Sequence, residues 1–125
     1  MRQIDQLRAT SLLSVFLLPL HISQDIVFGF DRAELNHLVG VAILLVAVCG
    51  ALLLRERRSG QMIMLLGGVM AAGMLPLHMR HGLRPEFLEK SGALFFMWTL
   101  YVLGVTGGFS VILAILTLRP KRIAS

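Results

Sequence analysis

The sequence has very little charge for its length. Among its 125 residues, 15% are Asp, Glu, Lys or Arg and 56% are hydrophobic. An average soluble domain carries about 25% charged residues. A soluble chain this short could not bury so much apolar surface. The shortage of charge therefore excludes an ordinary soluble domain and indicates that lipid is the solvent.

Cysteine is almost absent as well. Cys49 stands alone, which excludes an internal disulfide and a CxxC motif, and we interpret it as a small apolar residue. The sequence also lacks the GxGxxG, P-loop, HExxH and GxSxG motifs. Because no polar segment is large enough to form a substrate pocket, we do not expect the chain to be an enzyme on its own. The net charge of +5 comes without an aromatic and basic stripe, so nucleic acid is not an expected partner.

Four long runs contain no charged residue, at 9–24, 38–54, 62–79 and 91–118. A helix that spans a membrane needs about 20 predominantly apolar residues. We therefore predict an all-α integral membrane protein, one domain over residues 1–125, with spans at about 4–29, 34–57, 59–79 and 89–118. The first run is not followed by an Ala-x-Ala-like site, so we expect a spanning helix there and not a cleaved signal peptide. Short connections make an up-down-up-down four-helix bundle the expected architecture.

Basic residues are distributed unevenly between the two ends of these spans. The amino-terminal segment, the 55–58 connection and the carboxy-terminal tail carry eight Lys and Arg, and the other two connections carry four. The positive-inside rule then predicts that both termini are cytoplasmic. All four histidines fall at the opposite, outward-facing end. In a bacterium this membrane would be the inner membrane.

One short string occurs twice. Leu18-Pro19-Leu20-His21 recurs 57 positions later as Leu75-Pro76-Leu77-His78. Two interpretations stay open. The string is the remnant of a tandem duplication of helical hairpins, which would be related by an axis along the membrane normal, or it is a chance match in a leucine-rich chain. Under the first interpretation, matched histidines lie at matched depth.

The histidines have polar neighbours at helical spacing. Asp25 is four residues after His21, and His81 is three after His78, so each pair would share a helix face. His37 begins the second span, near the end of the first. We expect these five residues to converge at the outer rim. A carboxylate at membrane depth is by default a hypothesis of a functional site, and Asp25 qualifies only if the first helix extends that far.

Three hypotheses for these side chains remain open. In the first, His21 and His78 are axial ligands of haem b, or they bind a transition metal (Cu, Zn or Fe) with Asp25, His37 and His81. In the second, the same residues relay protons or ions. In the third, they are polar residues of the interface with no cofactor at all, which the sequence favours equally. The corresponding functions are a redox or metal-handling membrane subunit, a small proton- or ion-coupled transporter, and a non-catalytic accessory subunit.

Small residues indicate where helices pack. Lipid provides no hydrophobic drive for helix association, so close approach through glycine must substitute. Gly67 and Gly68 in the third span and Gly104 and Gly108 in the fourth are the predicted packing positions. A dimer contact through Gly104 and Gly108 is the competing interpretation. The expected partners are the bilayer and either further copies of the chain or a larger membrane complex.

Overall fold

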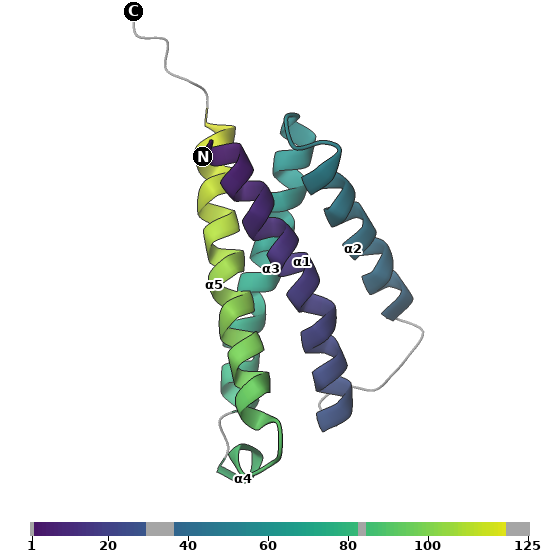
Figure 1. Cartoon of the computed structure of the whole chain (residues 1–125), viewed down its shortest axis with the longest axis vertical. Helices are drawn as coiled ribbons and strands as arrows, with labels where there is room; N and C mark the ends of the chain where they lie inside the picture. The colour runs from purple at the N-terminus through teal and green to yellow at the C-terminus, as the bar shows by residue number, and fades with distance from the viewer. Residues whose placement is uncertain (1, 30–36, 83–84, 120–125) are drawn as a thin grey trace, which may run out of the picture.

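The computed structural model describes residues 2–29, 37–82 and 85–119, and the side chains at 37–38 and 80–82 lie outside the description. All regular structure in these ranges is helical, which confirms the all-α prediction (Figure 1). The helices are α1 (Gln3–Phe28), α2 (His37–Leu52), α3 (Arg58–Gly82), the single-turn α4 (Pro85–Leu88) and α5 (Ala93–Leu118). α1 and α3 cover nearly the same residues as the first and third predicted spans, 4–29 and 59–79.

Three of these helices are long and apolar enough to cross a membrane: α1, α3 and α5, with spans of 26, 22 and 26 residues. α2 is shorter, with 16 residues, which corresponds to about 24 Å against a hydrocarbon core of about 30 Å. It ends at Leu52, earlier than the predicted limit near residue 57. The reason is a tight turn, in which the Arg57 amide donates to the Leu54 carbonyl and Gly60 packs directly on that same carbonyl. The four-span topology and the cytoplasmic termini remain predictions.

The interior of the protein contains polar as well as apolar side chains, and large apolar side chains cover much of its outside. The buried residues of α1 follow one stripe at spacings of three and four, and most of them are polar: Leu7, Ser11, Ser14, Leu17, His21 and Asp25. Phe16 on the same helix is 69% exposed, and Leu94 on α5 is 82% exposed. In water this arrangement would be unfavourable. It is the arrangement expected when lipid surrounds the helices.

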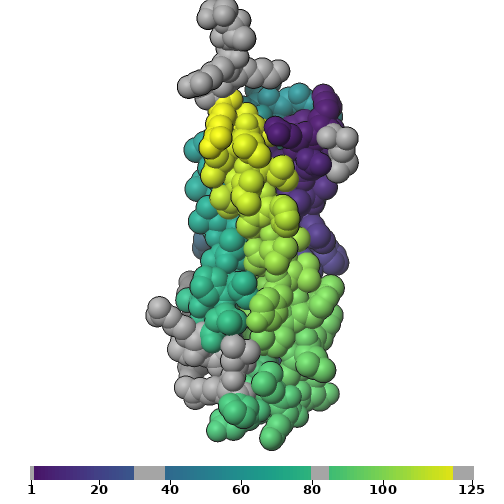
Figure 2. Space-filling model, turned by 90° about the vertical axis from the view of Figure 1, so that its left-hand side faces the viewer, coloured from purple at the N-terminus to yellow at the C-terminus, as the bar shows by residue number. Residues whose placement is uncertain are grey.

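The three long helices pack together, and α2 lies at the edge (Figure 1). α1 and α3 run in the same direction, and α5 runs antiparallel to both and contacts both along much of its length. Figure 2 shows α3 and α5 side by side over the height of the molecule. α2 contacts α3 and α1 near the α2–α3 turn and diverges from them toward its own first residue.

Glycines explain how closely α3 and α5 approach. A Cβ added to Gly104 would lie 2.8 Å from the Cβ of Leu75, and one added to Gly68 would lie 2.9 Å from the Cβ of Ser110. A Cβ at Gly107 would lie 2.5 Å from the backbone nitrogen of Ala72. Real Cβ atoms do not come so close to other atoms, so the α3–α5 contact requires glycine at these positions.

The other two glycines predicted to pack helices are placed differently. No atom lies within 4 Å of a Cβ added at Gly67 or Gly108. Gly67 instead lines an apolar groove between α2 and α3. Of the four predicted glycines, Gly68 and Gly104 thus face the α3–α5 contact, and Gly67 and Gly108 face open space because of the way their helices are rotated.

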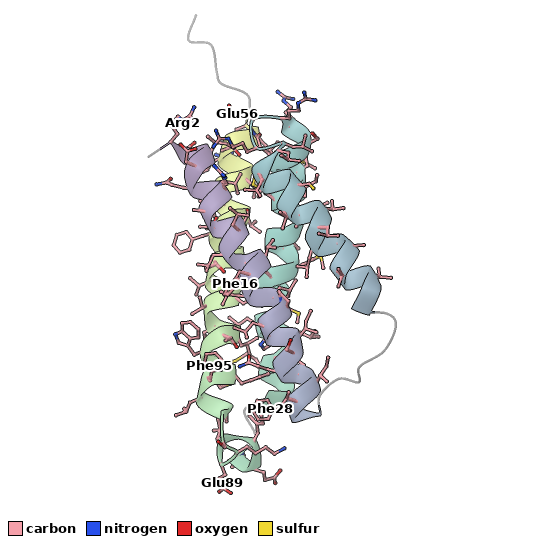
Figure 3. All side chains as sticks on the ribbon, turned by 45° about the vertical axis from the view of Figure 1, so that its right-hand side comes forward. Arg2, Phe16, Phe28, Glu56, Glu89 and Phe95 are labelled. Atoms are coloured by element: carbon pink, nitrogen blue, oxygen red, sulfur yellow. The ribbon has the colours of Figure 1, made fainter. Side chains whose placement is uncertain are left out.

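Ion pairs join α1 to the α2–α3 turn. Asp5 pairs with Arg2 at 3.2 Å and with Arg55 at 3.5 Å. Glu56 forms ion pairs with the same two arginines at 3.8 and 3.7 Å. Figure 3 shows Arg2 and Glu56 at this end of the molecule, opposite Phe28 and Glu89. The residues are partly exposed, so each pair stabilises the fold by at most about 1 kcal/mol.

Candidate metal site

The two parallel helices α1 and α3 bring the repeated histidines together. Their ring centroids are 5.0 Å apart, with an angle of 79° between the ring planes. Each histidine follows a proline by two residues, and Pro19 and Pro76 both lie inside their helices. The matched strings therefore occupy the same depth in the molecule, and their imidazoles face each other.

Asp25 faces both imidazoles. It lies within α1, which continues to Phe28, and it is 6% exposed. Its Oδ2 is 3.2 Å from Nε2 of His78, and its Oδ1 is 3.9 Å from Nε2 of His21. The first helix therefore extends as far as Asp25, as the functional-site hypothesis for this residue requires. The carboxylate is buried and lies near both imidazoles.

The backbone of α3 orients His78. Its Nδ1 is 3.0 Å from the carbonyl oxygen of Met74. A carbonyl only accepts hydrogen bonds, so Nδ1 is the protonated nitrogen that donates. In the neutral ring Nε2 then carries a lone pair, and this lone pair points at Oδ2 of Asp25.

α5 orients His21 in a comparable way. Nδ1 of His21 is 3.5 Å from Oγ1 of Thr99. The single hydroxyl proton of Thr99 is directed to Oε1 of Gln24 at 2.6 Å or to the Phe96 carbonyl at 2.8 Å. The Thr99 oxygen is then left to accept from Nδ1–H of His21, and the Nε2 lone pair of His21 is directed toward Asp25. That Nε2 makes no hydrogen bond within the described residues.

The result is that ligand atoms of three side chains lie close together. One ligand atom each from His21, Asp25 and His78 lies within 4.8 Å of the others. Two imidazole nitrogens that carry lone pairs and a carboxylate are all acceptors, so a cation between them is favourable. Two histidines and one carboxylate are a known ligand set for zinc and for non-haem iron. The cluster could therefore hold a metal ion.

Aromatic rings close the cluster on one side. The Phe96 ring lies 4.7 Å from the His21 ring and 6.1 Å from the His78 ring. Phe28 and Phe87 pack edge-on against Phe96 at 5.7 and 5.2 Å. His21 is fully buried behind this layer, whereas the His78 side chain is 15% exposed. An ion would therefore reach the cluster past His78.

Two other histidines were predicted to join the site. His37 begins α2 and His81 lies in the last turn of α3, but both side chains lie outside the described residues. The structure thus brings together His21, Asp25 and His78.

Three contributors were not anticipated from the sequence: Thr99, Gln24 and Phe96. A signal for Thr99 was present. Thr99, Thr106 and Ser110 recur at spacings of seven and four, which puts three polar side chains on one face of an otherwise apolar helix, and all three are buried. The sequence carries no comparable signal for Phe96, which is one of several aromatic residues near the start of α5.

Comparison of the chain with protein-family models, with curated proteins and with solved structures gives no match. The function therefore has to be argued from the site alone.

Proposed function

We propose that this protein is a small membrane subunit that binds one divalent transition-metal ion through His21, Asp25 and His78. One observation carries the proposal: three ligand atoms from two parallel helices lie within 4.8 Å of one another. The orientation of each imidazole supports it. Metal-binding histidines almost always donate their other ring N–H to a carbonyl, a carboxylate or water, and Met74 and Thr99 are placed to accept here.

The ligand types favour zinc or ferrous iron. Imidazole and carboxylate suit these ions, whereas Cu(I) prefers thiolate and thioether sulfur. Three protein ligands also leave one coordination position open, as in catalytic zinc sites and unlike closed structural ones. A site with an open position and a half-buried third ligand suits the uptake and release of a metal, so the proposed role is metal handling.

Haem is less compatible with this geometry. Two axial histidines need a planar gap between their rings that is wide enough for a porphyrin. Here the rings are in edge-to-face contact at 5.0 Å, and Phe96 and Asp25 lie against them.

A proton relay is the second candidate function. The separation of 3.2 Å between Asp25 Oδ2 and His78 Nε2 also suits an ion pair with a protonated imidazole. In that case the same three residues would bind a proton where the first proposal puts a metal. The two functions differ in what they retain: a metal-handling subunit binds one equivalent of metal, and a relay binds none.

Metal titration of the purified protein tests the proposal. We expect one equivalent of Zn²⁺ to bind in mild detergent by calorimetry, and Asp25→Asn to weaken that binding by more than about a hundredfold, beyond the loss typical of a supporting residue. Asp5→Asn is the matched control, because Asp5 is an acidic residue of the same helix far from the cluster, and it should bind Zn²⁺ as the parent does. Equal affinities in the two variants would overturn the proposal. If neither Zn²⁺ nor Fe²⁺ binds, and a pH-driven flux in liposomes is lost in Asp25→Asn, the relay is correct instead.

A further inference from the structure

The α2–α3 face carries a second feature, which is independent of the metal site. A groove of about 400 Å³ lies between these helices and is lined almost entirely by apolar atoms. Its walls come from the middle of both helices and include Ala42, Ile43 and Val46 on α2 and Ile63, Gly67 and Met70 on α3. Such a groove, on the outer face of a protein whose long helices suit a membrane, is open to lipid.

Two exposed arginines lie at the α2–α3 turn, near the end of the groove that Ile63 lines. Arg57 and Arg58 are exposed, and neither makes an ion pair with an acidic side chain in the described part of the chain. Their neighbour Arg55 is different, because it pairs with both Asp5 and Glu56. Arg55 thus contributes to the fold through ion pairs, whereas Arg57 and Arg58 are available to bind an anion.

The spacing from charge to groove matches an amphipathic molecule. α3 begins at Arg58, and Ile63 is the first groove residue on that helix, five positions later. Five residues of helix rise about 7.5 Å. The first turn of α3 also adds a partial positive charge at this end. The order along the helix is therefore two cations, one helix turn and an apolar channel, which is the order of phosphate, glycerol and acyl chain in a phospholipid.

We propose that the α2–α3 groove binds an anionic phospholipid, with its phosphate on Arg57 and Arg58 and an acyl chain between the helices. Basic residues near the membrane surface select anionic lipids in this way. The occupant also explains why α2 stands apart from α3: the acyl chain takes the place of the side chains that would otherwise fill the space.

Lipid binding to the purified full chain tests this proposal. We would measure retention of phosphatidylglycerol and of phosphatidylcholine with identical acyl chains by native mass spectrometry. The parent should bind phosphatidylglycerol about tenfold more tightly. The double variant Arg57→Gln/Arg58→Gln should lose this preference and still bind both lipids weakly.

Filling the groove tests the position of the acyl chain. Gly67 lines the groove, and a Cβ added there meets no atom of another helix within 4 Å, so Gly67→Leu puts a larger side chain at the groove wall. We expect this variant to lose both lipids. Gly73→Leu is the matched control, since Gly73 has equal space on the same helix but does not line the groove. Ala42→Leu fills the groove from the opposite wall and decides the matter if Gly67→Leu does not fold.

Three results would overturn the proposal. One is equal affinity of the parent for the two lipids. Another is unchanged phosphatidylglycerol binding in a folded Gly67→Leu or Ala42→Leu variant. The third is loss of a dimer, and not of lipid, on filling the groove, which would assign the groove to a second copy of the chain. Zn²⁺ binding should stay at the parent level in all these variants, so the outcome is separate from that of the metal site.

Discussion

The first helix of each of the two hairpins, α1–α2 and α3–α5, carries the same Leu-Pro-Leu-His string in its second half, but the two hairpins close differently. α3 and α5 approach closely through Gly68, Gly104 and Gly107. α2 has one glycine at a helix contact, Gly50, and it packs on Ile63 of α3 and not on α1. α1 therefore packs mainly against α5, and α5 thus contacts the first helix of each hairpin, α1 and α3. The shared string is thus compatible with two different helix arrangements, and the hairpin with more glycines between its own helices is the more closely packed one.

The same difference separates the two histidines. His21 is fully buried, and Thr99 and Phe96 of α5 contact it. His78 is partly exposed, and its Nδ1 is held by its own helix through the Met74 carbonyl. The Nδ1 of one imidazole is thus oriented by a neighbouring helix, and the Nδ1 of the other by its own helix backbone. We expect the first to be the rigid ligand and the second the one that an arriving ion meets.

The largest effect on stability should come from disrupting the close contact between α3 and α5. Gly107→Ala places a methyl group 2.5 Å from the Ala72 backbone nitrogen, and we expect it to destabilise the protein by about 3 kcal/mol, the upper end for overpacking. Gly108→Ala, one residue away with open space, should change stability by less than about 1 kcal/mol. Reversible unfolding in mixed micelles measures both. Similar values for the two variants would mean that α3 and α5 are not in close contact.

Removing each histidine should distinguish the buried ring from the exposed one. His21→Ala leaves a cavity against Phe96, and we expect a loss of about 2 kcal/mol in the free energy of unfolding. His78→Ala removes a ring at the edge and should cost less than about 1 kcal/mol. Both should abolish stoichiometric Zn²⁺ binding. A larger loss of stability in His78→Ala than in His21→Ala would contradict the conclusion that His21 is the more firmly packed ring.

Thr99→Val tests the support that α5 gives to His21. The variant removes the acceptor for Nδ1–H of His21 at nearly constant volume. We expect Zn²⁺ affinity to fall by about tenfold, as for other residues that orient metal ligands. Thr106→Val is the control, because Thr106 bonds Ser14 at 3.0 Å away from the cluster. Calorimetric titration of both gives the answer, and equal affinities would remove Thr99 from the site.

The smallest effect is expected in the α1–α5 contact. Ser14→Ala removes the hydrogen bond to Thr106, and such bonds between membrane helices contribute about 0.6 kcal/mol each. Because this change in the free energy of unfolding is small, the variant and the parent should be unfolded in micelles side by side. A loss of several kcal/mol would show that hydroxyl pairs, and not helix contact, hold α1 in place.

Much of the fold and part of the site could be predicted from the sequence. Charge-free runs located the long helices, and the repeated string predicted matched imidazoles. The location of Asp25 in a helix also had a readable cause. Gly29 ends α1 in a left-handed conformation, with φ of 78°, and its amide donates to the carbonyls of Asp25 and Ile26. Glycine at that position is a common helix terminator.

Helix rotation could not be predicted. Large apolar residues occur on all sides of α2 and α5, so hydropathy alone does not reveal which face turns inward, and in α5 the signal lies in the spacing of Thr99, Thr106 and Ser110. This is why Gly104 and Gly108 looked equivalent although only Gly104 meets α3, and why Phe96 was not singled out. The early end of α2 depends on Gly60 packing against the Leu54 carbonyl, a contact between turn residues that periodicity does not describe.

The ion pairs of Asp5 and Glu56 tie α1 to the α2–α3 turn at one end of the molecule, and the cluster of Asp25 lies near the other end of the same helix. α1 is thus held at one end by ion pairs with the α2–α3 turn. At the other end, a metal ion bound as proposed would link α1 to α3, in addition to the contacts that Gln24 and Phe28 make with α5. The proposed metal would then tighten helix packing at one membrane surface, which a neighbouring protein could sense.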